Sequence, residues 1–254
     1  MLIPDHTFKI AAFLRSQLAV LLTLVFSLAI APQAVAQCGP NITLTAGKWS
    51  MVGVPCQPGP SNTIGDIFGP SLNATDYAVT WIVWKRIYDA PAQCSVASGP
   101  ADCYVKLTLT DTVNTGDAFW IFTTVSATLN LSAVGASDTP GPQFQFPATL
   151  STDGSSRYYL FANPYKAAVT GPDLVFPTSI FGFFPFAASA QQAVNFSIIS
   201  QNVHYWNGNT YFTQDITTNA ATFVPKQAAW LEMLRPNPNF IPFSDVRVPD
   251  PGAP

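Results

Sequence analysis

Charged side chains are scarce in this sequence. They make up 10% of its 254 residues, against about 25% in an average soluble domain. The formal net charge is only −3, and no basic run occurs anywhere in the chain. The small net charge does not imply a polyanionic partner, and the lack of a basic run means that nucleic acid is not expected as one.

Motifs that carry catalysis are also lacking. The sequence has no G-x-S-x-G turn, no phosphate-binding glycine loop and no D-x-D-x-D calcium loop. His204 is the only histidine beyond the N-terminal segment, and we interpret it as a core or cross-strand residue. The sequence thus predicts a protein that is not an enzyme and has no cofactor or metal. A secreted hydrolase is an alternative, and it would pair Glu232, the only glutamate, with an aspartate.

Residues 1–36 have the pattern of a secretory signal peptide. Lys9 and Arg15 supply positive charge, the 13-residue stretch Leu18–Ile30 is apolar, and an A-x-A site ends at Ala36. A membrane anchor is the alternative interpretation, but it needs about 20 apolar residues. We expect cleavage after Ala36 and a mature protein that is secreted, periplasmic or attached to the cell surface.

Cysteine usage fits an exported protein. An even number of cysteines in an exported chain predicts disulfides, and four cysteines allow three connectivities. We favour Cys94–Cys103, which closes a short turn-forming loop, together with Cys38–Cys56. A metal site is the weaker alternative, because no C-x-x-C pair occurs. A lipoprotein site at Cys38 is disfavoured by Gln37 before it.

Proline and aromatic residues are abundant, with 23 prolines and 13% aromatics. Short β-branched and aromatic segments between turns predict an all-β fold. We expect a helical turn at 63–69 that is capped by Thr63, and a hairpin turn at Asn207-Gly208. Strands are expected at 41–56, 77–88, 104–110, 144–146, 194–199 and 203–206, and around Trp120 and Trp230.

Two stretches of the chain echo each other. Gly116–Thr123 and Lys226–Met233 both predict a turn followed by a Trp-centred strand, downstream of Trp49–Pro55 and Tyr158–Pro164 respectively. This order of landmarks indicates an internal duplication into two tandem β-sandwich-like modules. The expected divisions are a signal peptide at 1–36, module 1 at 37–135, a linker at 136–156, module 2 at 157–235 and a Pro-rich tail at 236–254.

The landmark order resembles a repeated module of secreted and surface-displayed bacterial proteins. In that family a W-N-L-[IV]-[SG]-x-P opening precedes a V-W-x-[YW]-[DN] strand and a G-x-[AG]-[FY]-[WF]-[IV] close. The matching segments here are 49–55, 83–84 and 116–121, and then 158–164, 205–207 and 227–231. Ser50 stands where the family has Asn. The resemblance implies a β-sandwich-like fold and a bacterial origin, and it transfers no catalytic residue.

Aromatic residues are the candidates for function. Trp81 and Trp84 are three positions apart, so they should face opposite sides of a strand. An exposed aromatic ring beside amide side chains suits a sugar, because the ring stacks on the pyranose while the amides bond its hydroxyls. The candidate ligand-binding residues are Tyr205, Trp206, Asn207, Asn209 and Tyr211.

A phenylalanine cluster is the second candidate. It comprises Phe176, Phe181, Phe183, Phe184 and Phe186, and we expect it to fold inward. If it is exposed, it would mark a partner or membrane surface. The sequence predicts an exported, non-enzymatic binding or structural protein, with polysaccharide or another surface protein as the partner and no membrane span after cleavage. A carbohydrate-binding module is the first alternative.

Overall fold

The computed structural model describes residues 41–56, 62–88, 90, 93–94, 102–131, 143–148, 156–180, 183–234, 240–242 and 245–251. All of them fall within one structural unit, Ala36–Pro254. The predicted signal peptide at 1–36, Cys38 and Phe181 lie outside the described residues. No helix among these residues is long and apolar enough to cross a membrane.

The predicted all-β fold is confirmed. The described strands form five sheets, and every pairing within those sheets is antiparallel. The helical elements of the described part are α2 (Ile64–Leu72), α3 (Ala190–Asn195) and the 3-10 turns η1 (Ala74–Asp76) and η2 (Gly171–Asp173).

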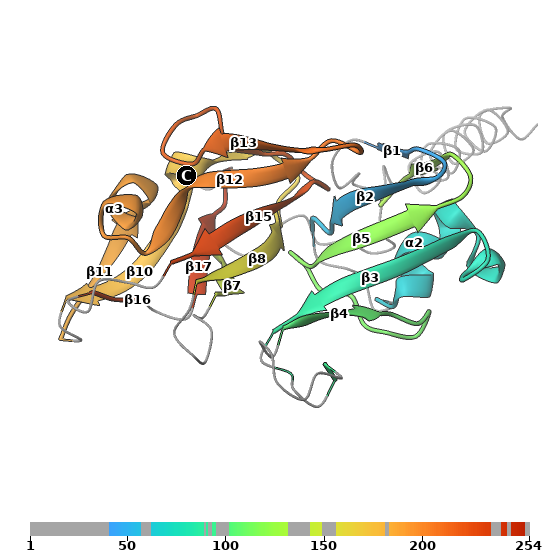
Figure 1. Cartoon of the computed structure of the whole chain (residues 1–254), viewed down its shortest axis with the longest axis horizontal. Coiled ribbons are helices and arrows are strands. Elements are labelled where there is room, and N and C mark those ends of the chain that lie inside the picture. Colours follow the sequence, from blue (N-terminus) through green and yellow to red (C-terminus); the bar gives the residue numbers. More distant parts are fainter. Residues whose placement is uncertain are drawn as a thin grey trace, which may run out of the picture. The chain divides into compact units, whose positions relative to one another are not determined.

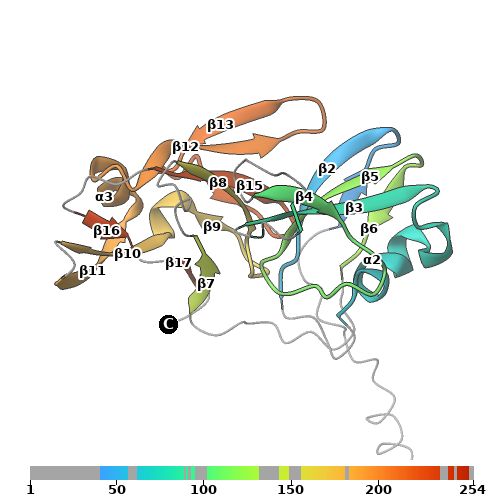
Figure 2. The ribbon, with the colours of Figure 1, turned by 60° about the horizontal axis from the view of Figure 1, so that its bottom comes forward.

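The first sheet has the strand order β2-β5-β3-β4 (Figure 1). Its strands are β2 (Lys48–Gly53), β5 (Ala118–Thr123), β3 (Trp81–Ile87) and β4 (Cys103–Lys106). One face packs on α2 and on the strand pair β1 (Ile42–Leu44) and β6 (Ala127–Leu129). Figures 1 and 2 show α2 on that single side of the sheet. The fully buried Trp81 and Phe119 lie in this core.

Helix α2 forms where the sequence predicts a helical turn. Thr63 Oγ1 accepts a hydrogen bond from the Asp66 N–H, and the Asp66 carboxylate accepts one from the Thr63 N–H, each at 3.2 Å. This reciprocal capping box satisfies backbone donors that a helix start leaves unpaired. Ile64 and Phe68 point into the core, as their helical spacing predicts. The helix is longer than expected and ends at Leu72.

The second sheet has the order β13-β12-β15-β8. Its strands are β13 (Tyr211–Asp215), β12 (Ile199–Trp206), β15 (Ala228–Met233) and β8 (Arg157–Ala162). The predicted hairpin turn joins β12 and β13, with Gly208 in the left-handed region at φ +94°. Asn207 Oδ1 accepts hydrogen bonds from the N–H groups of Asn209 and Thr210, which closes the turn.

A covering sheet packs over the second sheet, so this half is a two-layer sandwich. Its strands are β11 (Phe184–Ser189), β10 (Val175–Ile180), β17 (Asp245–Pro249) and β7 (Gln143–Pro147), with β16 (Phe240–Pro242) paired to β10. The short pair β9 (Val169–Thr170) and β14 (Thr222–Phe223) lies beside it in the same core. Strand β7 comes from the expected linker and β17 from the expected tail (Figure 2). Both segments therefore contribute to the second core.

Several expected strands differ from the structure, and the one expected at 77–88 begins only at Trp81. The strand predicted at 194–199 is wrong. Ser189 and Gln192 form a capping box that begins α3, and β12 starts only at Ile199. The segment 41–56 is two strands in different sheets, separated by a turn at Gly47 with φ +71°. Strand β4 stops at Lys106, before a turn that Asp111 stabilises by accepting a hydrogen bond from the Thr108 hydroxyl.

The first and second sheets share one strand order. When β2, β5, β3 and β4 are matched with β8, β15, β12 and β13, the neighbours in each sheet correspond. The turns before β5 and β15 also correspond, since Gly116 at φ +78° and Lys226 at φ +67° both have a left-handed backbone conformation. The duplication itself stays a prediction.

One predicted disulfide is present. Cys94 and Cys103 are bonded, with Cα atoms 5.5 Å apart, which confirms that pairing. Because Cys38 lies outside the described residues, the Cys38–Cys56 pairing stays a prediction. The confirmed bond joins the first residue of β4 to the loop that precedes it.

The two sheets meet where β2 and β8 end. Gly53 N–H donates to the Lys226 carbonyl at 2.8 Å, and Cys56 N–H donates to the Pro164 carbonyl at 2.7 Å. A Cβ on Gly53 would lie 2.2 Å from the Ala162 Cβ, so only glycine permits this approach. A small apolar cluster that includes Met51, Ala162 and Trp230 fills the junction.

Candidate functional site: an aromatic groove at the junction of two sheets

The first sheet directs one aromatic-rich face away from its core. Strand alternation places Val52, Phe119 and Val83 inside, so their neighbours point outward. The register sets Met51 and Trp84 on either side of Trp120 on the outer face. This row of large side chains is continued by residues of the edge strands, Trp49 of β2 and Tyr104 of β4.

The second sheet has a matching outer face. Trp230 of its central strand lies between Leu160 and His204. Trp206, two positions beyond His204, is paired with Tyr211 across the hairpin. Both central tryptophans, Trp120 and Trp230, thus hold equivalent positions in their sheets.

These two faces line one groove at the junction. One hollow, of about 360 Å³, is lined by Trp49, Trp84, Tyr104, Trp120, Trp206 and Tyr211. A neighbouring hollow, of about 380 Å³, is lined by Arg86, Tyr104, Tyr158, His204, Tyr211 and Trp230. Tyr104 and Tyr211 belong to both hollows, so we treat the two as one surface and call it the aromatic groove.

Contacts between the rings fix the groove. Trp120 lies at its centre, with ring centroids 6.4 Å from Trp49, 5.7 Å from Trp206 and 6.4 Å from Tyr211, all edge-to-face. Trp206 and Tyr211 contact each other at 5.0 Å. The indole N–H of Trp206 donates to the Trp49 carbonyl at 2.8 Å, which ties the second sheet to the first. These contacts hold the rings in place before any ligand arrives.

Several of these rings are open to solvent. The exposed fraction is 47% for Tyr211, 39% for Tyr104 and 37% for Trp49. Trp84 is half-buried, and its indole N–H is buried without a hydrogen-bond partner in the described part of the chain. The groove therefore combines accessible ring faces with a donor whose hydrogen bonding is incomplete.

Polar groups lie at two places along the groove. Near Trp49, Lys48 Nζ donates to Asn209 Oδ1 at 2.6 Å, a further link between the two sheets. At the other side, Arg86 and His204 line the second hollow. No carboxylate is among the described residues that line either hollow.

The hydroxyls of Tyr104 and Tyr158 stay protonated at neutral pH, because the pKa of each is raised. Burial raises the pKa of Tyr104 above its usual value of 10.0. Burial also raises the pKa of Tyr158, and the negative charge of Glu232 adds to this rise. The Tyr104 hydroxyl can therefore donate a hydrogen bond to a ligand, whereas the Tyr158 hydroxyl is hydrogen-bonded to Glu232.

The structure brings together most of the predicted ligand-binding residues. Trp206 and Tyr211 line the groove, while Asn207 and Asn209 are exposed in the turn beside it. The structure corrects the prediction for Tyr205, which is only 1% exposed and faces the second core. Strand alternation explains the error, since Tyr205 and Trp206 are adjacent and must face opposite sides.

Four groove residues of the first sheet were not predicted as candidates. Trp49, Trp84, Tyr104 and Trp120 come from four different strands, and only the sheet register brings them together. The sequence contained one signal for this face, because Trp81 and Trp84 were expected on opposite sides of a strand. The structure confirms this, with Trp81 in the core and Trp84 in the groove.

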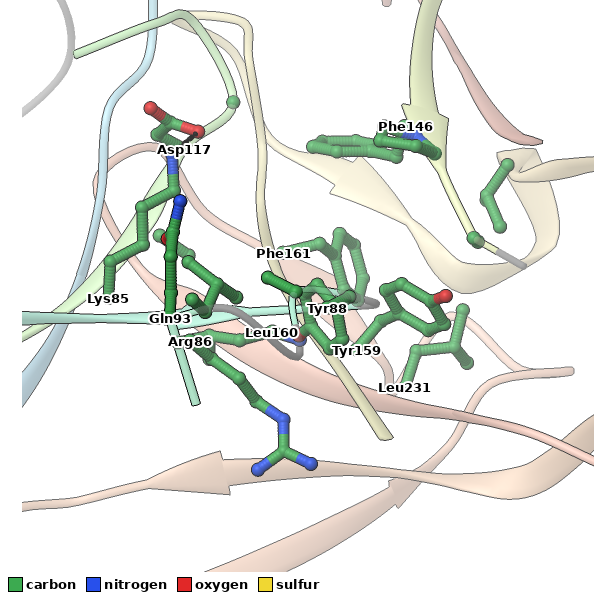
Figure 3. A pocket seen from close by; sticks show the side chains of 17 residues that line it. Lys85, Arg86, Tyr88, Gln93, Asp117, Phe146, Tyr159, Leu160, Phe161 and Leu231 are labelled. Atoms are coloured by element: carbon green, nitrogen blue, oxygen red, sulfur yellow. Dashed lines mark hydrogen bonds and ion pairs between the residues drawn. The ribbon is translucent and has the colours of Figure 1, made fainter. Parts of the chain in front are cut away.

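A further hollow of about 510 Å³ adjoins the end of β3 (Figure 3). Lys85 Nζ lies 2.7 Å from Asp117 Oδ1 at one side of it. Tyr88 stacks on Tyr159 with centroids 4.4 Å apart, and its hydroxyl oxygen accepts a hydrogen bond from the Leu160 N–H at 2.7 Å. The polar groups in it are thus largely engaged with one another.

The phenylalanine cluster divides between core and surface. Phe176 is buried, and Phe186 packs against the second core. Phe183 and Phe184 are 81% and 68% exposed, so the inward prediction is wrong for them. Phe183 lies between β10 and β11, and Phe184 is the first residue of β11.

The remaining chemical candidates, Glu232 and His204, both lie beside Tyr158. Glu232 does not line the aromatic groove, and His204 lies in a ring contact of 5.9 Å with Tyr158. Within the described ranges, no group of three or more His, Cys, Asp or Glu could hold a metal ion. Comparison with protein families, curated proteins and solved structures found no match.

Proposed function

We propose that this protein is an exported, non-enzymatic carbohydrate-binding protein, and that the aromatic groove is its binding site. The observation that carries this proposal is the convergence of six aromatic rings from both sheets on one open hollow. Each hollow of the groove is near the lower end of the range of about 300–1,000 Å³ that is usual for ligand sites.

The chemistry of the groove suits a sugar. The C–H faces of a pyranose stack on aromatic rings, and its hydroxyls form hydrogen bonds with the tyrosine hydroxyls and with the nearby amide groups. Because ring contacts already fix Trp120, Trp206 and Tyr211, binding orders few side chains. A preorganised site of this kind loses less entropy on binding.

The groove favours binding over hydrolysis. Glycoside hydrolysis needs two carboxyl groups across the scissile bond. The described residues that line the two hollows include none. The alternative of a hydrolase built on Glu232 therefore receives no support from this site.

The test compares variants of the purified protein on a panel of insoluble polysaccharides. Tyr211→Ala removes an exposed ring, so it should weaken retention about tenfold or more while leaving the fold intact. Trp206→Ala should weaken it further, because it also removes the hydrogen bond to Trp49. Phe183→Ala is the matched control, since it removes an even more exposed ring outside the groove.

Two outcomes would contradict the proposal. If the folded Tyr211→Ala and Trp206→Ala variants bind as well as the wild-type protein, the groove is not the site. If the wild-type protein binds no polysaccharide in a broad panel, the carbohydrate proposal fails. The exposed Phe183 and Phe184 would then be the first surface to test for a protein partner.

A further inference from the structure

One side chain in the groove, Arg86, is positively charged, and its ion-pair contact with Asp102 is long. Arg86 belongs to the outer face of β3, opposite its neighbour Lys85. Figure 3 shows the two side chains extending in different directions, with Lys85 toward Asp117 and Arg86 away from it. Lys85 is thus engaged with Asp117, whereas the Arg86 side chain lines the second hollow of the groove.

Aromatic rings hold the Arg86 guanidinium in position. Its central carbon lies 5.5 Å from the ring centroids of both Tyr104 and Trp230, and 5.7 Å from that of Tyr88. Attraction between a cation and aromatic faces favours this placement. Tyr104 and Trp230 also line the hollow, so the cation belongs to the same surface on which the sugar would stack.

The ion pairing of Arg86 is incomplete. Asp102 Oδ2 lies 3.6 Å from Arg86 Nη2, longer than a hydrogen bond, but 3.0 Å from Arg157 Nε. Asp102 therefore lies closer to Arg157, which is almost fully buried, than to Arg86. Within the described ranges Arg86 has no other ion-pair partner, and its Nε–H has no acceptor. Its side chain remains 23% exposed.

From this geometry we infer that the aromatic groove recognises an acidic polysaccharide, a polymer of uronates, and that Arg86 binds the carboxylate. The inference rests on the proposed carbohydrate-binding function. A guanidinium presents its N–H donors in a planar fork that matches a carboxylate with two parallel hydrogen bonds. A uronate ring could stack on the groove while its carboxylate reaches this fork.

The test uses one sugar backbone in two charge states. Polygalacturonate carries free carboxylates, and fully methyl-esterified homogalacturonan is the same polymer without them. We expect the wild-type protein to bind polygalacturonate about tenfold or more tighter than the ester. Dextran sulfate supplies anionic charge without carboxylates, and we expect it to bind more weakly than polygalacturonate.

Variants then assign the preference to Arg86. Arg86→Met keeps a long apolar stem but removes the charge and the fork, so it should lose the preference and still bind the ester. Arg86→Lys keeps the charge without the fork and should retain only part of the preference. Lys166→Met is the control, because it removes one exposed positive charge that does not line the groove. Ester binding in each variant reports whether the groove is intact.

The outcomes separate this inference from the proposal beneath it. Equal binding of acid and ester by the wild-type protein would overturn the inference, with the carbohydrate function standing. A preference that survives in Arg86→Met, or dextran sulfate binding as tightly as polygalacturonate, would overturn the carboxylate assignment. A wild-type protein that binds no polysaccharide would overturn both.

Discussion

Gly53 should be essential to the contact between the two sheets. A Cβ added at this position would lie 2.2 Å from the Ala162 Cβ and 3.2 Å from the Gln227 carbonyl oxygen. The first distance is far inside van der Waals contact, so Gly53→Ala must push β2 away from β8. Overpacking of this kind typically costs about 1–3 kcal/mol.

Thermal unfolding provides the assay. A loss of 1 kcal/mol lowers Tm by about 2–4 °C in domains of 150–250 residues. Gly53→Ala should therefore lower Tm by about 2–12 °C. Because Trp49 lies on the same strand as Gly53 and contacts Trp120, the near-ultraviolet circular dichroism of the tryptophans should change as well.

A second substitution tests the reasoning directly. Ala162→Gly alone should destabilise the protein by about 1–2 kcal/mol, because it removes a buried methyl and loosens the chain. Combined with Gly53→Ala it removes the clashing methyl, so the pair should cost less than the sum of the single changes. If Gly53→Ala leaves Tm unchanged, or if the two costs simply add, the close approach of β2 and β8 is refuted.

Three further predictions concern stability. The hydrogen bond from the Thr63 hydroxyl lowers the pKa of Asp66 below 3.8, so its stabilising effect is present at neutral pH and lost as pH falls below that value. Asp66→Asn should therefore reduce the urea midpoint at pH 7 more than at pH 3, and an equal reduction would contradict the cap. Replacing Cys94 and Cys103 by serine should lower the free energy of unfolding in urea by about 2–3 kcal/mol. An unchanged midpoint would argue against a stabilising disulfide. Tyr205→Phe removes a buried hydroxyl without a partner in the described part, so it should raise stability by up to about 1 kcal/mol. A loss of polysaccharide binding in this variant would return Tyr205 to the site.

Local features of the fold could be predicted because neighbouring residues decide them. The capping box of Thr63 and Asp66 lies within a single turn, and the Asn207-Gly208 hairpin depends on one left-handed glycine. The mistaken strand at 194–199 failed for a related reason. Its apolar residues fit either structure, and the cap at Ser189 decided for the helix.

Only part of the candidate site could be predicted by the same reasoning. Alternation correctly separates Trp81 from Trp84, but it cannot say which side of β12 faces the core. Tyr205 was therefore expected in the site although the second core buries it. That choice depends on the covering sheet, whose strands come from segments far from β12 in the chain.

The sequence by itself determined the strand character of the chain, its turns and caps, and one disulfide, because side-chain shape and short-range hydrogen bonds act over a few residues. Only the tertiary structure decided that Trp49 lies beside Trp206 and that Arg86 lines the same groove as His204. Those neighbours are far apart in the sequence. Their meeting depends on sheet register and on the close approach at Gly53, which no local pattern encodes.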